Sequence, residues 1–215
     1  EGLDVKPDLS TAKDYFELSA KQKNSNALYY LGNFYYYGIN IEPDLKKAKK
    51  YYKSAASQEN SEAYCMLGEF YFKRKKFLKA KKNFELSESY NNVEAHYNLG
   101  VLYENGIGIE KDIEKAIEHY SKCAEVYEYK IYFNYDDCFY EIDKYNKNFY
   151  LSQNDLALIY LFEFDNVEMA EQYLRKAGLN GYPYAQYNLA LLSQFFTHDY
   201  ELANRMFSGA SEKQF

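Results

Sequence analysis

His119 and Cys123 come closest, among the residues of this 215-residue chain, to the types and spacing of nucleophilic chemistry. Residues four apart share one face of a helix, so an imidazole could activate a thiolate there. Both residues, however, occupy places where an equivalent segment carries Tyr51 and Ala55. We therefore predict that His119 and Cys123 pack inside the fold and catalyse nothing.

The remaining histidines and cysteines give no further chemical motif. His96 and His198 fall in different segments, and the sequence gives no reason for them to converge. Cys65, Cys123 and Cys138 cannot all pair within one chain and lack the CxxC spacing of zinc or redox sites. We expect reduced cysteines, no metal and no cofactor.

Two other motifs also favour structural roles. The Gly-Ile-Gly segment at residues 106–108 could begin a phosphate-binding loop, but a strand should precede such a loop, and here the pattern predicts a helix. Asp136, Asp137, Glu141 and Asp143 form an acidic cluster without the ligand spacing or glycine of a calcium loop. We interpret the first as a turn and the second as a solvated face or helix cap.

The composition indicates a folded, acidic chain. Hydrophobic residues make up 47% of the sequence and aromatic residues 20%, which is enough for a core. The net charge of -6 argues against binding to nucleic acid or anionic membrane, because both need a dense Lys/Arg surface. The lysines at 46–53 and 73–76 are expected on solvated faces. No apolar run approaches the ~20 residues that span a bilayer, so we expect no membrane insertion.

A repeat with fixed internal spacing runs along the chain. One copy consists of Ala27, Leu31, Gly32, Tyr35, Gly38, Ile41, Asp44, Lys47, Ala48, Tyr51, Tyr52, Ala55 and Ala56. A second copy has identical offsets: Ala95, Leu99, Gly100, Tyr103, Gly106, Ile109, Asp112, Lys115, Ala116, His119, Tyr120, Cys123 and Ala124. Each half of a copy places small or apolar residues on one stripe of a 3.6-residue helix. The pattern predicts pairs of short helices.

Three shorter copies and a leading half complete the array. The shorter copies begin at Ala63, Leu156 and Ala185, and the last two carry alanine in place of the helical glycine. We predict one domain over residues 1–215 with a half repeat at 1–25, repeats at 26–61, 62–93, 94–126, 151–183 and 184–215, and an insert at 127–150.

The second helix of most repeats is preceded by a capping residue. The capping positions hold Asp8, Asp44, Asp112, Asn166 and Asp199, and only Lys76 departs from the series. Turns of the longer repeats pair Gly2 with Asp4, Gly38 with Asn40 and Gly106 with Gly108, residue types that tolerate positive φ. A glycine inside the first helix costs about 1 kcal/mol relative to alanine, so we expect close helix packing to offset it.

The recurring pattern resembles the Sel1-like repeat family, which is related to tetratricopeptide repeats and has units of the form A-x3-LG-x2-Y-x2-G-x-G-V-x2-D-x2-KA-x2-YY-x-KAA. The resemblance covers the chain except residues 127–150. It implies an all-α fold, a right-handed superhelical solenoid of antiparallel helix pairs with a concave face. Members usually act as adaptors or scaffolds, and such arrays also occur in secreted bacterial factors and in the quality-control machinery of the endoplasmic reticulum. Some relatives with regularly paired cysteines bind β-lactams, but Cys65 and Cys123 stand singly here, so we do not expect that activity.

In tetratricopeptide-like arrays the first helix of each pair lines the concave groove at fixed offsets from the glycine position. The preferred partner-binding residues are Tyr29, Asn33, Tyr36, Tyr37, Glu69, Phe72, Tyr97, Val101, Glu104, Asn154, Leu158, Tyr187 and Leu191. The same offsets also give Asn26, Glu62, Cys65, Lys73, Glu94, Asn105, Leu151, Leu161, Phe162, Tyr184, Gln194 and Phe195. Tyrosines and glutamates there favour a protein or peptide partner with basic and apolar side chains.

We therefore expect a protein-interaction scaffold and not an enzyme. A structural spacer or oligomerisation module is the alternative, with a hydrolytic enzyme less favoured. The aromatic insert at 127–150 is too apolar for a free linker, and we expect it to pack and to offer a second contact surface. The chain begins in a half repeat, so we expect a fragment of a longer protein. A cytoplasmic setting is favoured, with secretion or the endoplasmic-reticulum lumen open if a signal peptide lies upstream.

Overall fold

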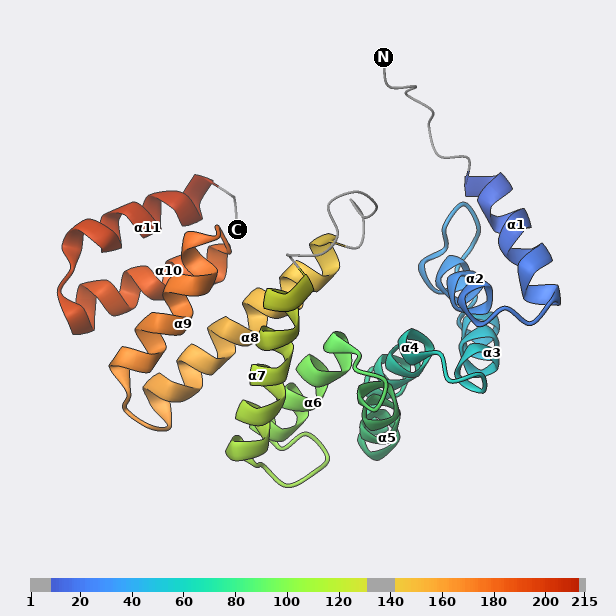
Figure 1. Cartoon of the computed structure of the whole chain (residues 1–215), viewed down its shortest axis with the longest axis horizontal. Coiled ribbons are helices and arrows are strands. Elements are labelled where there is room, and N and C mark those ends of the chain that lie inside the picture. The colour runs from blue at the N-terminus through green and yellow to red at the C-terminus, as the bar shows by residue number, and fades with distance from the viewer. Residues whose placement is uncertain (1–8, 131–141, 213–215) are drawn as a thin grey trace, which may run out of the picture. The chain divides into compact units, whose positions relative to one another are not determined.

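The computed structural model describes residues 9–130 and 142–212, with side chains over 9–125 and 147–211. Every regular element in these ranges is helical, which confirms the all-α prediction. The elements are α1 Leu9–Lys21, α2 Ser25–Tyr37, α3 Leu45–Ala56, α4 Ser61–Phe72, α5 Phe77–Glu88, α6 Val93–Asn105, α7 Ile113–Lys130, α8 Ile142–Phe162, α9 Val167–Leu179, α10 Pro183–Leu192, the π-helix η1 Ser193–Thr197 and α11 Tyr200–Glu212 (Figure 1).

The chain divides into two compact units, which we call the N-terminal unit (Glu1–Ala95) and the C-terminal unit (His96–Phe215). In the N-terminal unit α2 packs on α3 and α4 on α5, while α1·α2 and α3·α4 contacts join neighbouring pairs. In the C-terminal unit α8 packs on α9 and α10 on α11, and α9 contacts α10. Within each unit, neighbouring helix hairpins therefore pack against one another, as expected of a repeat array.

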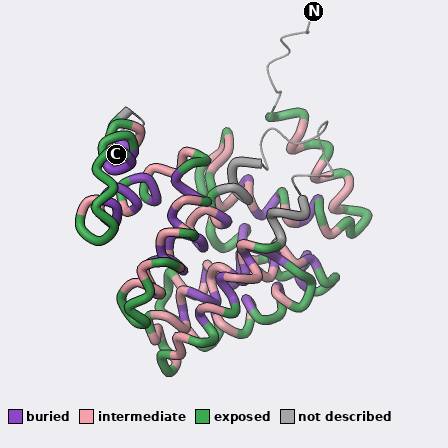
Figure 2. The backbone as a smooth tube through the Cα atoms, turned by 60° about the vertical axis from the view of Figure 1, so that its left-hand side comes forward, coloured by how far each residue is buried: buried purple, intermediate pink, exposed green. Residues whose placement is uncertain are grey.

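Buried and exposed positions alternate along the helices with the predicted stripe, although α1 has no buried residue (Figure 2). The core of the N-terminal unit gathers Leu28, Ala48, Tyr52, Ala55, Ala56, Ala63, Met66 and Leu67. The main core of the C-terminal unit gathers Ala157, Ala170, Leu174, Ala177, Ala185, Leu189, Ala190, Leu192, Leu202 and Met206. Alanine dominates both sets because a small side chain lets two helix backbones approach closely.

The helical glycines have the role that the repeat predicted. A Cβ added at Gly100 would lie 2.6 Å from the ring of Tyr120, which is fully buried on α7. The same addition at Gly68 would lie 2.4 Å from the ring of Phe84, and at Gly32 equally close to Tyr52. An aromatic ring from the second helix thus lies directly on the backbone of the first, so close packing explains why glycine stands inside a helix.

The predicted caps are confirmed at four positions. Asp44 accepts hydrogen bonds from the backbone N–H groups of Lys46 and Lys47. Asp112, Asn166 and Asp199 cap α7, α9 and α11 in the same way, by accepting from Lys115, Met169 and Leu202. Lys76 makes no side-chain cap, and Asp8 lies outside the described residues. The structure adds first-helix caps that the sequence analysis missed, at Asn24, Asn60 and Asn92.

The predicted turns also have the expected backbone. Gly38 and Asn40 have φ of 69° and 53°, and Gly106 and Gly108 have φ of 61° and 70°. These left-handed conformations reverse the chain between the two helices of the longer repeats. The pair at Gly2 and Asp4 lies outside the described residues.

The two ends of the predicted insert belong to helices. Its beginning extends α7 to Lys130, and its end is the first part of α8, from Ile142. Phe149 is buried and Tyr150 stacks on Tyr182, with 5.9 Å between ring centroids. The acidic cluster at Asp136 to Asp143 and Cys138 fall where no side chain is described, so the insert as a contact surface stays a prediction.

Candidate functional site

His119 packs as predicted, and it also meets His96, a contact that the sequence did not predict. The ring of His119 stacks on Tyr103 at 5.6 Å, as Tyr51 stacks on Tyr35 at 5.5 Å in the equivalent repeat position. His96 converges with it, because their Nδ1 atoms lie 3.4 Å apart across α6 and α7. Equivalent repeat positions do not indicate this pair, because the contact depends on how the two helices of one hairpin face each other.

Burial and the neighbouring His119 lower the pKa of His96 to about 4, so its imidazole is neutral at pH 7. Cys123 is fully buried, and its Sγ lies 3.5 Å from the backbone oxygen of Asn148. A thiol that points at a backbone carbonyl inside the core is not an accessible nucleophile. The His119 and Cys123 pair is therefore packing.

One group in the N-terminal unit could hold a cation. The Sγ of Cys65 and carboxylate oxygens of Glu69 and Glu94 all lie within 4.8 Å of one another. Cys65 and Glu69 stand four apart on α4, while Glu94 is the second residue of α6. All three occupy the offsets predicted to face a partner.

We call the positions at the predicted offsets of the first helices, α2, α4, α6, α8 and α10, the first-helix face. In the N-terminal unit, Asn33 accepts a hydrogen bond of 2.8 Å from the hydroxyl of buried Tyr52. Tyr29 lies against the same ring at 6.2 Å. Both residues support the core, so only part of each side chain faces outward.

The other N-terminal positions are more open. Tyr36 lies under the Nζ of Lys73, which sits 5.0 Å from the ring centroid and also donates to the phenol oxygen. Tyr37 is 58% exposed. Phe72 is half-buried against Phe77, at 5.6 Å between centroids. The N-terminal first-helix face thus presents tyrosines beside a cation of its own.

Polar side chains at the C-terminal first-helix face are linked by hydrogen bonds. Tyr97 donates a hydrogen bond of 3.2 Å to Asp155, and Glu104 accepts one of 2.7 Å from the hydroxyl of Tyr120. Asn154 is buried and accepts from Asn188 at 2.8 Å, which links α8 to α10.

The apolar predicted positions of this unit flank these groups. Val101, Leu158 and Leu191 are half-buried, and Val101 packs against the cluster around Tyr120. Tyr187 is 46% exposed and meets Phe207 edge-on at 5.9 Å. They remain predicted contacts for a partner.

Asp155 and Tyr182 were missed by the offset rule. Asp155 falls between two of the predicted offsets on α8, and Tyr182 precedes α10 as its cap residue. A signal for Asp155 was available, because it is the only charged residue of the segment from Phe149 to Phe162.

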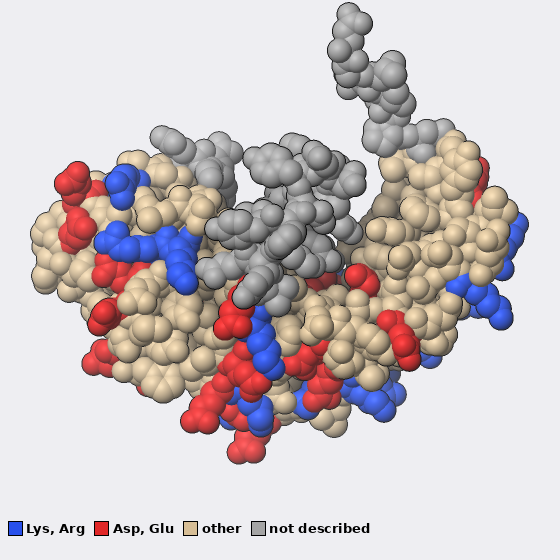
Figure 3. Space-filling model, in the orientation of Figure 1, with Lys and Arg blue, Asp and Glu red and all other residues tan. Residues whose placement is uncertain are grey.

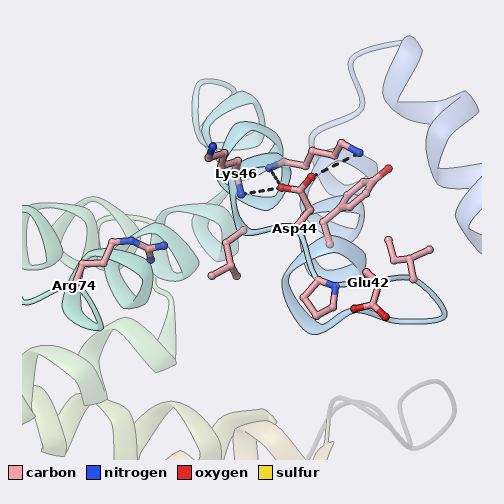
Figure 4. Close-up of a pocket in the computed structure, with 9 residues that line it drawn as sticks. Glu42, Asp44, Lys46 and Arg74 are labelled. Atoms are coloured by element: carbon pink, nitrogen blue, oxygen red, sulfur yellow. Dashed lines mark hydrogen bonds and ion pairs between the residues drawn. The ribbon is translucent and has the colours of Figure 1, made fainter.

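A shallow pocket opens at a different place, beside the loop that joins α2 to α3 (Figure 4). It is lined by Tyr35, Ile41, Glu42, Pro43, Asp44, Leu45, Lys46, Lys47 and Arg74. The backbone N–H of Lys47, more than any other group, lowers the pKa of Asp44, which also pairs with the Lys47 ammonium at 3.6 Å. The pocket contains none of the predicted partner-binding residues. Its carboxylate, Asp44, already pairs with Lys47.

Charges of both signs are interspersed on the face seen in Figure 3. Over the described ranges, the helices are too short or too polar for any to cross a bilayer.

Comparison with known proteins identifies the repeat. The family model described as Sel1 repeat matches residues 1–24, 25–60, 61–89, 93–125, 151–182 and 183–214, so the leading half repeat is also matched. No curated protein matched the chain.

Solved structures share the fold. A Sel1 repeat protein from Oxalobacter formigenes is 21% identical, with a TM-score of 0.74 over 97% of this chain and 79% of that one. A protective antigen of uropathogenic Escherichia coli is 18% identical, with a TM-score of 0.55 over 95% of this chain and 49% of that one. Immunity protein Pa5087 from Pseudomonas aeruginosa is 15% identical, with a TM-score of 0.57 over 97% and 76%. At such identities the likeness is one of fold alone.

Proposed function

The chain belongs to the Sel1 repeat family of non-catalytic scaffolds, which generally act in protein–protein interaction, and we propose that it binds a protein or peptide partner along its first-helix face. Repeat arrays suit this role because their stacked helices present one side chain after another along a continuous surface.

Exposed aromatic side chains on the predicted offsets support this proposal. Tyr37, Phe162, Tyr184, Tyr187 and Phe195 are between 46% and 75% exposed, although each could bury a large apolar area. Aromatic rings give large contact area at a low cost in side-chain entropy and are enriched where partners bind most strongly. Four of the five belong to the C-terminal unit, so we assign the principal contact to that unit.

The exposed rings also allow a clean test. Tyr29 and Tyr97 lie against buried rings of the second helices, so their replacement would disturb the core. Tyr184 and Phe195 are 56% and 63% exposed, and changing both to serine removes contact area with little loss of packing. Partner proteins captured from cell extract by the wild-type chain, once identified by mass spectrometry, should be captured at least tenfold less by this double variant.

The matched control changes exposed apolar residues of the same unit that lie off the first-helix face. Tyr200→Ser and Leu179→Ser remove rings and methyl groups that are 60% and 57% exposed on α11 and α9. This control should capture the partner as the wild type does. Equal capture by the Tyr184/Phe195 double variant would contradict the proposal and favour a structural spacer, and a change in its sedimentation mass alone would favour an oligomerisation module.

A further inference from the structure

A half-buried carboxylate lies beside the predicted positions of the C-terminal first-helix face. Asp155 is on α8, and its Oδ2 accepts a hydrogen bond of 3.2 Å from the hydroxyl of Tyr97 on α6. Its other oxygen accepts at 3.2 Å from the amide of Asn154. Asn154 is itself held by Asn188 of α10. Three first helices therefore fix the position of this carboxylate, which makes it part of a built site and not a mobile surface charge.

A second carboxylate shares the same surroundings. Glu104 of α6 accepts a hydrogen bond of 2.7 Å from Tyr120, and its charge opposes the ionisation of Asp155. Across the described part of the chain, the ion pairs include neither of these two residues. Two carboxylates that repel each other without a nearby Lys or Arg create a local field that attracts a cation.

Tyr182 adds an unsatisfied polar atom to this place. Its hydroxyl is buried and has no hydrogen-bond partner among the described residues. Burial first, and then the charge of Asp155, raise the pKa of this hydroxyl to about 12, so it keeps its proton at neutral pH. A buried hydroxyl without a hydrogen-bond partner destabilises the fold, and a ligand that hydrogen-bonds to it removes this cost. The ring lies between Tyr150, stacked at 5.9 Å, and Tyr184 at 5.7 Å.

We propose that Tyr97, Glu104, Tyr120, Asp155 and Tyr182 form a receptor, here called the Asp155 site, for an arginine side chain of the protein partner. The proposal rests on the proposed function and names the chemistry of one contact within it. Guanidinium carries five N–H donors in a plane, so it can donate to the carboxylate of Asp155 and to the Tyr182 oxygen together. It also stacks on aromatic rings and is more weakly hydrated than an ammonium group, which suits a half-buried, tyrosine-lined place.

The exposed ring of Tyr184 extends this surface outward. It is 56% exposed and lies beside Tyr182, so the apolar stem of a bound arginine would cover it. An arginine flanked by apolar residues in an exposed peptide segment is therefore the motif that this unit is suited to bind. Charge complementarity determines this choice, since an acidic or uncharged anchor would leave both carboxylates without a counter-charge.

The test uses two small probes that differ only in charge. N-acetyl-arginine methylamide and N-acetyl-citrulline methylamide have nearly the same shape, but citrulline has a neutral urea group in place of the guanidinium. Each is titrated into the isotope-labelled chain while amide resonances of α6, α8 and α10 are followed by NMR. We expect saturable shifts with the arginine probe and binding at least tenfold weaker with the citrulline probe.

Two variants locate the binding. Asp155→Asn keeps the shape of the side chain and should weaken the arginine probe about tenfold. Asp165→Asn makes the same change in the exposed loop after α8 and should leave binding unchanged. Circular dichroism and thermal melting check that both variants are folded.

The site also predicts a pH profile. Burial first, and then Glu104, raise the pKa of Asp155 to about 6. The groups that face it are Tyr97 and Glu104 on α6, Tyr120 on α7, Asn154 on α8 and Tyr182 before α10. Because a cation binds the ionised carboxylate, affinity should fall about tenfold between pH 7.5 and pH 5.0 in the wild type. It should fall much less in Asp155→Asn.

Several outcomes would overturn the proposal. These are equal binding of the two probes, unchanged binding by Asp155→Asn, or an equal affinity for N-acetyl-lysine methylamide, which would show attraction to charge without recognition of guanidinium. Partner capture decides the proposed function separately. Loss of capture with Tyr184/Phe195 but not with Asp155→Asn would sustain the interaction surface and reject the arginine site.

Discussion

Tyr52 of the N-terminal unit and Tyr120 of the C-terminal unit occupy the same position of the repeat, yet their hydroxyls have different partners. Both rings are fully buried and lie on a helical glycine, Gly32 or Gly100. The hydroxyl of Tyr52 donates to the neutral amide oxygen of Asn33, whereas that of Tyr120 donates to a carboxylate. The packing is thus constant between the units, while the charge at the edge of the first helix varies.

The first-helix faces extend this contrast. In the N-terminal unit Lys73 lies over Tyr36, so an aromatic side chain already has a cation beside it. In the C-terminal unit the tyrosines surround Asp155, and no cation of the described chain pairs with it. The repeat therefore constrains the residues between helices and leaves the outward positions free to acquire a binding chemistry, which differs from one unit to the other.

The close packing of a buried ring on a helical glycine, which both units share, can be tested by substitution of these glycines. Gly68→Ala and Gly100→Ala each place a methyl group within 2.4–2.6 Å of a buried ring, so the helices must separate. We expect each change to lower the free energy of unfolding by about 1–3 kcal/mol, more than the helix propensity of alanine restores. Urea denaturation followed by circular dichroism measures both.

Gly178→Ala in α9 is the control for these substitutions. Its added Cβ would meet neighbouring atoms at 3.4 Å, an ordinary contact, so stability should rise by up to about 1 kcal/mol. A gain in stability at Gly68 but not at Gly100 would show that the two units do not share the same close packing.

The charge of Asp155, which distinguishes the C-terminal unit, can be tested by measuring stability at different pH values. A folded pKa of about 6 means that Asp155 binds its proton more tightly in the folded chain than in the unfolded one. Its contribution to stability is therefore fully present at low pH and is lost as the pH rises through 6. We expect Asp155→Asn to be more stable than the wild type at pH 7.5, with this advantage shrinking by about 1 kcal/mol at pH 5.0.

Thermal melting of the wild type and of Asp155→Asn at both pH values measures the difference in their stability. Groups that titrate alike in the two proteins cancel in this difference. An advantage that is the same at both pH values would contradict a raised pKa at Asp155. A carboxylate that the fold holds at the expense of stability is the kind of residue expected where a chain binds something.

Sequence reasoning predicted most of the features that recur, although it missed the first-helix caps at Asn24, Asn60 and Asn92, and it missed contacts that occur once. The caps at Asp44 and Asp112 and the turns at Gly38 and Gly106 have identical offsets in two repeats, so comparison of copies was enough. The contact between His96 and His119 depends on how two helices of one hairpin face each other, which spacing along the chain does not give.

Asp155 was missed for a related reason. Fixed offsets describe one line along a helix, whereas the side chains that contact one another across α6, α8 and α10 cover a wider strip, and Asp155 lies beside that line. The unsatisfied hydroxyl of Tyr182 depends on three-dimensional packing around a cap position, where the side chain makes no cap of its own. No sequence pattern indicates which polar atom the fold leaves without a partner.

Replacing Lys73, the cation that lies over Tyr36, gives the smallest expected effect. It bears most directly on the difference in charge between the two first-helix faces. The hydrogen bond to Tyr36, and to a lesser degree the nearby Glu69, raise the pKa of Lys73, which shows that the ammonium is stabilised where it lies. Because this side chain is exposed, Lys73→Gln should lower stability by less than about 1 kcal/mol. Tyr36 and Glu69 would then lack their common cationic neighbour, as Tyr97 and Asp155 do in the other unit.

The arginine probe should consequently shift amide resonances of α2 and α4 in Lys73→Gln but not in the wild type. The control Lys79→Gln, which removes an exposed charge from α5, should also show no shift. If the probe leaves α2 and α4 unaffected in Lys73→Gln, then an acidic, tyrosine-bearing face is not enough, and the contrast between the units must depend on the buried hydroxyl of Tyr182.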